Sequence, residues 1–120
     1  MRREVRIGSA SAGAGSKANG YVQLGEYRDG SAINTPVMIV NGAEDGPRLW
    51  VQACIHGDEY NGDISIIQTA RGLDAAKMKG AFIGFPALNI TAYQTCQRGS
   101  PFDHKDMNRS FPGSAHGGFT

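Results

Sequence analysis

The sequence predicts an α/β fold built around a strand, a helix and a second strand, and three patterns support this prediction. A β-rich run, RLWVQACI, occupies residues 48–55. Apolar residues at helical spacing follow at about residues 58–73. The nearly continuous apolar run GAFIGFPAL at 80–88 is then typical of a strand covered on both faces. Strand, helix and strand at this spacing predict a βαβ unit in an α/β sheet.

The first 34 residues are expected to contain a short strand at about residues 5–7 and a flexible loop. Residues 8–20, GSASAGAGSKANG, are small and lack periodicity, which is typical of a mobile loop. A phosphate-binding loop would need Lys and then Ser or Thr directly after its second glycine, where this run has Ala14 and Gly15. We therefore predict that residues 1–34 form N-terminal strands and a flexible loop.

Two strands are predicted in the next part of the chain. The run INTPVMIVNG at 33–42 is β-rich and closes with the turn dipeptide Asn-Gly. The sequence AEDGP at 43–47 has turn chemistry and separates this run from RLWVQACI at 48–55. The two runs are therefore expected to form neighbouring strands.

A helix is predicted at about 58–73 from an apolar stripe, despite the low helix propensity of Gly62. Its positions recur at three and four residues and are Tyr60, Ile64, Ile67 and Ala70. From Asn89 to the end the chain is polar, rich in turn residues and without a clear period. Loops of this length are uncommon in compact domains unless they have a function.

The composition excludes several classes of partner. The formal net charge is +1, from 12 basic and 11 acidic residues without blocks, so we expect no nucleic-acid partner. No apolar run approaches the roughly 18 residues that span a bilayer, and no signal-peptide pattern follows the basic start. Cys54 and Cys96 lie far apart, which favours buried thiols in a reducing compartment. We expect a cytoplasmic protein without a membrane partner, and a homo-oligomer is compatible with the sequence.

The segment CIHGDEYNGD at 54–63 contains a candidate metal site. It places His56 where a strand leaves the sheet and Glu59 in the first turn of the next helix, the edge where α/β folds bind ligands. Gly57 allows a tight turn, and this spacing can aim an imidazole nitrogen and a carboxylate at one zinc ion at about 2.0–2.2 Å. In the alternative interpretation, His56 caps the turn and Glu59 complements the positive end of the helix.

A second polar cluster lies in RGSPFDHKDMNRSFPG at 98–113, an irregular segment that follows the predicted buried strand. Its charged and amide side chains can converge on a pocket and are Arg98, Asp103, Asp106, Asn108 and Arg109. An arginine fork suits a carboxylate, and an asparagine offers both a donor and an acceptor. The alternative is a solvated polar loop in which Asp106 pairs with an arginine.

Taken in order, GAEDGPRLWVQACIHGDEYNG, GAFIGFPALN and RGSPFDHKDMNRSFPG resemble the succinylglutamate desuccinylase/aspartoacylase family of zinc-dependent amidohydrolases, relatives of the zinc carboxypeptidases. The resemblance runs from Thr35 to Gly113. It implies a zinc carboxypeptidase-like mixed sheet with flanking helices, truncated in this chain. Residues 35–120 would be the incomplete N-terminal part of the catalytic domain.

The resemblance also implies roles for individual residues. His56 and Glu59 would be two ligands of Zn²⁺, and Arg98 would polarise the scissile carbonyl. Asn108 and Arg109 would bind the carboxylate of the substrate. Asp106 would orient Arg109 or its neighbours. The third zinc ligand of the family, a histidine, and its catalytic glutamate would lie beyond Thr120. His104 and His116 are expected to be solvated, although zinc accepts loop ligands within reach.

The implied activity is zinc-dependent hydrolysis of the amide bond of an N-acyl amino acid or a similar small amide, with that small molecule as the partner. One alternative is a peptidase of the metallocarboxypeptidase type. A second is a non-catalytic module that binds a small carboxylate or a metal, and a third is a structural domain in which the pair only caps a turn. With two ligands identified, the 120-residue chain alone is expected to be inactive and to hold zinc poorly.

Overall fold

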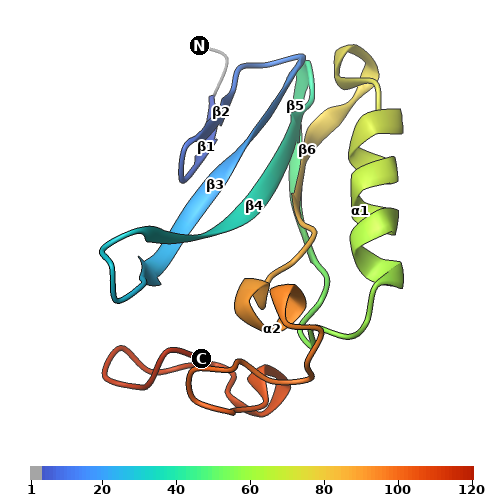
Figure 1. Ribbon diagram of the computed structural model, residues 1–120. Coiled ribbons are helices and arrows are strands. Elements are labelled where there is room, and N and C mark those ends of the chain that lie inside the picture. The colour runs from blue at the N-terminus through green and yellow to red at the C-terminus, as the bar shows by residue number, and fades with distance from the viewer. Residues whose placement is uncertain (1–3) are drawn as a thin grey trace.

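A mixed four-stranded sheet forms the centre of the computed structural model, which describes residues 4–120 (Figure 1). The first three residues of the expected N-terminal region lie outside this range. The strands are β1 (Val5–Ile7), β2 (Ala10–Ala12), β3 (Ser16–Glu26), β4 (Ala32–Asn41), β5 (Glu44–Gln52) and β6 (Lys79–Phe85). The helices are α1 (Asn61–Gly72) and α2 (Ile90–Gln94), with 3₁₀ turns η1 (Ala75–Lys77) and η2 (Met107–Arg109). The predicted α/β fold is confirmed.

The strand order of the main sheet is β3-β4-β6-β5. β4 pairs antiparallel with both β3 and β6, whereas β5 and β6 are parallel and are joined through α1. The predicted βαβ unit is therefore confirmed.

The prediction that the runs at 33–42 and 48–55 form adjacent strands is wrong, because β6 lies between β4 and β5. The connection between them crosses the start of β6, where the Gly42 N–H donates to the Gly80 carbonyl at 2.7 Å. A Cβ at Gly42 would come within 2.5 Å of the Met78 carbonyl oxygen, so glycine permits this crossing. The expected turn at 43–47 is correspondingly short, since β5 already begins at Glu44.

Both faces of the central strands β4 and β6 are covered, because their alternate residues point to opposite sides, whereas β5 is exposed along most of its length. On one face, the β1–β2 hairpin packs on β4 and β6 through Val5, Ala10, Ala12, Val37, Ile39, Ala81 and Ile83. On the other face, α1 packs through Ile66 and Ala70 against Val40 and Phe82. The prediction that the run at 80–88 forms a strand covered on both faces is confirmed, since β6 is buried from its second residue to its last.

The predicted flexible loop at 8–20 is wrong for most of its length, because this segment contains β2 and the start of β3. Ala10 and Ala12 are each only 1% exposed. The Ser9 N–H donates to the Tyr21 carbonyl at 2.9 Å, and the Ser9 hydroxyl accepts from the Tyr21 N–H at 2.8 Å. The small residues that indicated mobility instead allow the hairpin to lie close to β3.

Helix α1 buries Ala70 as predicted, but Ile66 takes the place in the core that was expected for Ile64. Ile64 is 53% exposed, while Ile66 is 4% exposed and faces the sheet. The position below Ile66 explains this choice, because a Cβ at Gly84 would lie 2.6 Å from the Ile66 side chain. The missing side chain on β6 therefore makes the space that Ile66 fills, and periodicity within the helix could not reveal it.

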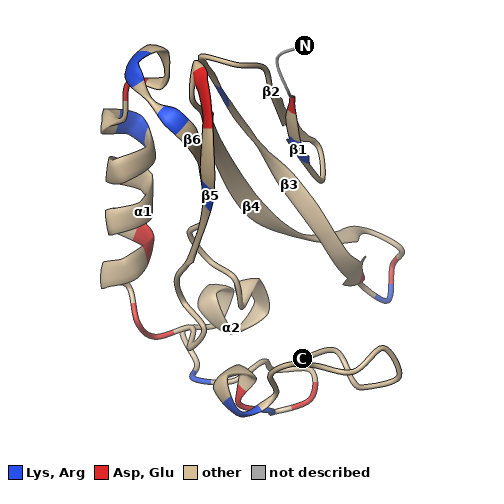
Figure 2. Cartoon of the chain, turned by 180° about the vertical axis from the view of Figure 1, so that it is seen from behind, with Lys and Arg blue, Asp and Glu red and all other residues tan. Residues whose placement is uncertain are grey.

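The segment after Asn89 lies at the end of the sheet where β5 and β6 lead into loops (Figure 1). It is irregular as predicted, except for the short helix α2 and the turn η2. Basic and acidic residues are interspersed along it and along the rest of the described chain (Figure 2). Among residues 4–120, no helix has the length and apolar character needed to cross a membrane.

Candidate metal and substrate site

The loop that carries His56 and Glu59 begins where β5 ends and is held by backbone contacts. Cys54 adopts a positive φ of 53°, a conformation that non-glycine residues rarely take. Its buried thiol donates to the Glu59 carbonyl at 3.1 Å, which closes the loop between these two residues. The prediction that both cysteines are buried holds for Cys54 and is wrong for Cys96, which is exposed.

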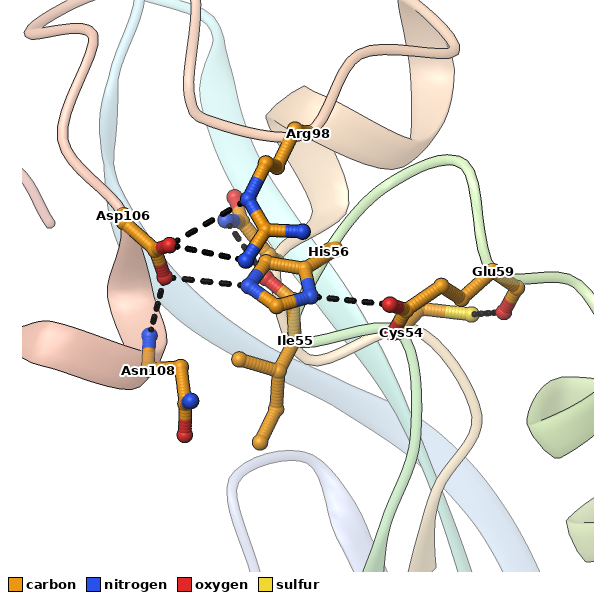
Figure 3. A network of polar contacts seen from close by, with 8 residues as sticks. Cys54, Ile55, His56, Glu59, Arg98, Asp106 and Asn108 are labelled. Carbon is orange, nitrogen blue, oxygen red and sulfur yellow. Dashed lines mark hydrogen bonds and ion pairs between the residues drawn. The ribbon is translucent and has the colours of Figure 1, made fainter.

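His56 lies at the centre of a polar network in which both of its ring nitrogens have carboxylate partners (Figure 3). Nδ1 is 2.9 Å from Glu59 Oε1, and Nε2 is 3.0 Å from Asp106 Oδ1. The predicted convergence of His56 and Glu59 is therefore observed. Glu59 was expected in the first turn of the helix, but α1 begins at Asn61, so both side chains belong to the loop.

Asp106 connects the two polar segments that the sequence singled out. Its Oδ2 accepts from Arg98 Nε at 3.3 Å and from Arg98 Nη2 at 3.1 Å. Its Oδ1 accepts from the backbone N–H of Asn108 at 2.9 Å, in addition to facing His56. The Arg109 N–H donates to the Asp106 backbone carbonyl at 3.0 Å, and the orienting role of Asp106 toward Arg109 or its neighbours stays a prediction.

These contacts shift the pKa values of His56 and Asp106 in opposite directions. Hydrogen bonds that His56 donates to the carboxylates of Glu59 and then Asp106 raise the pKa of His56, against the effects of burial and of the nearby Arg98. The hydrogen bond from His56 lowers the pKa of Asp106, and the Arg98 guanidinium lowers it further. The arrangement therefore favours an imidazolium between two carboxylates when no other cation is present.

Asn108 and Arg109 lie on η2 with exposed side chains. The side-chain amide of Asn108 extends away from the Asp106 carboxylate, and the hydrogen bond to that carboxylate comes from the Asn108 backbone N–H (Figure 3). Arg109 borders an open pocket together with Asp106, Ser110 and Phe111. The structure thus brings His56, Glu59, Asp106 and Arg98 into one network, with Asn108 and Arg109 beside it.

The donor set fits part of a zinc site. Zinc binds imidazole nitrogen and carboxylate oxygen, and a ligating histidine typically donates its other N–H to a carboxylate, as Nε2 of His56 can to Asp106. Among residues 4–120, no group of three or more His, Cys, Asp or Glu side chains is arranged to hold a metal. His104 and His116 are exposed, as expected for solvated side chains.

Asn89 is a buried residue next to the polar network that the sequence interpretation did not single out. It lies directly after the apolar run of β6 and is 2% exposed, and its side chain contacts the loop that carries His56. The sequence feature that could have pointed to Asn89 is a polar residue at the end of a buried strand, directly before the Ile-Thr-Ala sequence that begins α2.

Comparison with known proteins identifies the family. The profile of the succinylglutamate desuccinylase/aspartoacylase catalytic domain matches residues 45–120. The chain belongs to this family. It is also 34% identical, over 105 residues, to the N-alpha-acetyl-L-2,4-diaminobutyric acid deacetylase of Halomonas elongata, covering 85% of this chain and 30% of that enzyme.

Solved structures of other proteins share the fold of this chain. A succinylglutamate desuccinylase/aspartoacylase from Rhodobacter sphaeroides matches with a TM-score of 0.78 and 34% identity, covering 86% of this chain and 32% of that one. The product-bound ectoine utilization protein EutE from Ruegeria pomeroyi matches with a TM-score of 0.73 and 28% identity, covering 86% and 31%. The predicted zinc carboxypeptidase-like fold is confirmed, and the chain spans about a third of the length of these relatives.

Proposed function

We propose that residues 35–120 form the N-terminal part of the catalytic domain of a zinc-dependent amidohydrolase that removes the acyl group from an N-acyl amino acid. The observation that carries this proposal is the network that joins His56, Glu59, Asp106 and Arg98 at the end of β5. A relative named as a deacetylase of an N-acetylated amino acid, at 34% identity, supports the substrate class.

His56 and Glu59 would hold the metal. Asp106 keeps a proton on His56 Nε2, which leaves the lone pair of Nδ1 on the side that faces Glu59. Nδ1 and the Glu59 carboxylate would then both ligate the metal, in the place of the proton that these two groups share when no metal is bound. When bound, zinc supplies a Lewis acid that activates water near neutral pH and polarises a carbonyl.

Arg98 is suited to polarise the scissile carbonyl. Asp106 engages its Nε and Nη2 groups and so fixes the plane of the guanidinium. The side chain is 58% exposed, and the donors that face away from Asp106 are available to a substrate oxygen. Donors placed before the reaction begins stabilise developing negative charge without further reorganisation.

Asn108 and Arg109 would bind the carboxylate of the substrate. Both are exposed and lie on the same turn, which the Asp106 carboxylate caps through the Asn108 N–H. An arginine fork can bind a carboxylate through two parallel hydrogen bonds, and an asparagine amide can add a third donor. This arrangement favours substrates that carry one free carboxylate next to the amide.

The test compares His56→Ala with His104→Ala in the intact protein that contains this chain. We expect His56→Ala to lose bound zinc and hydrolysis of N-acetyl and N-succinyl amino acids, because it removes a metal ligand. His104→Ala, which changes an exposed histidine, should retain both. If His56→Ala kept the zinc content and turnover of the unmodified protein, the proposed site would be wrong.

The same assay separates the alternative activities. Cleavage of peptides with a free C-terminus, without turnover of N-acyl amino acids, would favour a metallocarboxypeptidase-type enzyme. Saturable binding of a small carboxylate without turnover of either substrate class would favour a non-catalytic module.

A further inference from the structure

We propose that Asn89 is a positioning residue that fixes the metal-ligand loop, residues 54–59, relative to Arg98. This inference rests on the proposed function, because it concerns how the same site is held in place. It assigns Asn89 no contact with substrate or metal, and it predicts that the geometry of the site depends on one buried amide.

The contacts of Asn89 extend in two directions. Toward the metal-ligand loop, its Nδ2 donates to the Ile55 carbonyl at 3.1 Å and its backbone N–H donates to the Cys54 carbonyl at 3.1 Å. Toward α2, its Oδ1 accepts from the Ala92 N–H at 3.4 Å and its carbonyl accepts from the Tyr93 N–H at 2.9 Å. The side chain therefore bridges the loop and the helix with both of its polar atoms.

Each side of this bridge leads directly to a group of the proposed site. Cys54 and Ile55 immediately precede His56 in the chain. The end of α2 leads to Arg98 through a tight turn, in which the Gln97 N–H donates to the Ala92 carbonyl at 3.0 Å. A shift of the loop against α2 would therefore change the separation between His56 and Arg98.

A second contact, between Gly57 and α2, restricts movement of the metal-ligand loop against this helix. A Cβ at Gly57 would lie only 2.0 Å from the carbonyl carbon of Ala92, so the backbones of the loop and α2 touch at this point. The bridge by Asn89 and the contact at Gly57 lie on either side of His56 along the chain. Together they hold the segment that presents the imidazole at two points.

The backbone of Cys54 provides a further reason for such a clamp. Its φ of 53° lies in the left-handed region, which is unfavourable for a residue with a side chain. Such a conformation persists only when the surrounding structure over-determines it. The bonds from the Asn89 backbone to Cys54 and from its side chain to Ile55 supply this constraint on one side, and the Cys54 thiol supplies it on the other.

The experiment uses Asn89→Ser in the intact protein, with Asn41→Ser as the matched control. A serine retains an oxygen that can cap α2 but cannot donate to the Ile55 carbonyl. Asn41 is 7% exposed and likewise donates through Nδ2 to a backbone carbonyl, that of Ala12 at 3.0 Å, far from the proposed site. The two variants therefore lose a similar buried hydrogen bond, and only one of them lies next to the metal-ligand loop.

The first measurement needs no metal. Hydrogen exchange of the amides of residues 54–59 in zinc-free protein should be at least about tenfold faster in Asn89→Ser and unchanged in Asn41→Ser, relative to the unmodified protein. The second is zinc affinity by chelator competition, which should fall by about tenfold or more only in Asn89→Ser, the range seen when outer partners of metal ligands are removed. If Asn89 only capped α2, serine would keep that role, and both the exchange rates and the zinc affinity would stay unchanged.

Two outcomes distinguish failure of this inference from failure of the proposed function. If His56→Ala abolishes zinc binding and Asn89→Ser keeps the affinity within about twofold, only the positioning role is wrong. If His56→Ala also leaves the affinity unchanged, the proposed metal site itself is wrong.

The unmodified protein offers an independent check should Asn89→Ser fail to fold. In mild denaturant, the amides of residues 54–59 should open together with those of α2, because Asn89 links the two segments. Opening of the loop while α2 stays protected would overturn the inference.

Discussion

Replacing Asp106 with asparagine changes one carboxylate oxygen into an amide nitrogen and tests whether this side chain organises the site. The carboxylate accepts four hydrogen bonds, one from His56, two from Arg98 and one from the Asn108 backbone. An amide offers one oxygen acceptor, and its NH₂ group can only donate. Wherever that NH₂ points, it faces donors that were previously satisfied.

The distribution of these donors predicts which contact fails. Oδ1 receives the bonds from His56 and from the Asn108 N–H, whereas Oδ2 receives those from Arg98. The amide oxygen should keep the Oδ1 position, because the imidazole there is nearly buried while Arg98 is largely exposed and can turn to solvent. Arg98 would then be released, and the expected loss in kcat/KM is about 10- to 100-fold, the range for outer-shell partners of a metal ligand.

The assay measures kcat, KM and zinc content of Asp106→Asn beside Asp103→Asn in the intact protein. Asp103 lies on the same segment, but its carboxylate accepts from Thr120 and Lys105 instead of from the network. We expect kcat to fall in Asp106→Asn with most of the zinc retained, and Asp103→Asn to stay within about twofold. If Asp106→Asn kept kcat/KM within about threefold at full zinc content, the network would not organise the reaction.

Two further predictions concern substrate binding and stability. In the intact protein, Arg109→Lys should lose much of its kcat/KM, because a point charge replaces a bidentate fork; a change below about threefold, roughly 0.7 kcal/mol, would mean that Arg109 does not bind the substrate. The hydrogen bond to Asp63, followed by burial, raises the pKa of Tyr93 to about 12 from its ordinary value of 10.0. Because the neutral phenol is favoured in the folded state, this contribution is fully present below pH 10 and is lost as the pH rises through about 12. The free energy of unfolding, measured by denaturant titration, should therefore fall across this range by at most about 2 to 3 kcal/mol, less solvent screening, and by a smaller amount in Tyr93→Phe. Equal slopes in the two proteins would exclude a role for the Tyr93 hydroxyl.

The sequence was most informative where the signal is local. The β5–α1–β6 unit could be predicted because each element has its own periodicity within a few residues. The position of β6 between β4 and β5 could not, since it depends on a chain crossing at Gly42 that no periodicity records. The N-terminal hairpin was missed for a related reason, because small residues are compatible both with a mobile loop and with close packing such as that of Ala10 and Ala12.

The same distinction applies to the candidate site. His56 and Glu59 are three residues apart, so their convergence could be predicted from spacing alone. The contact between His56 and Asp106 joins residues 50 positions apart, and it depends on where the segment after β6 returns to the end of β5. Asn89 begins that return, which gives a physical reason why a buried amide stands at this position. In the proposed role of Asn89, the distance between the proposed metal ligands and Arg98 is set less by those residues themselves than by the hydrogen bonds of the two chain segments that carry them.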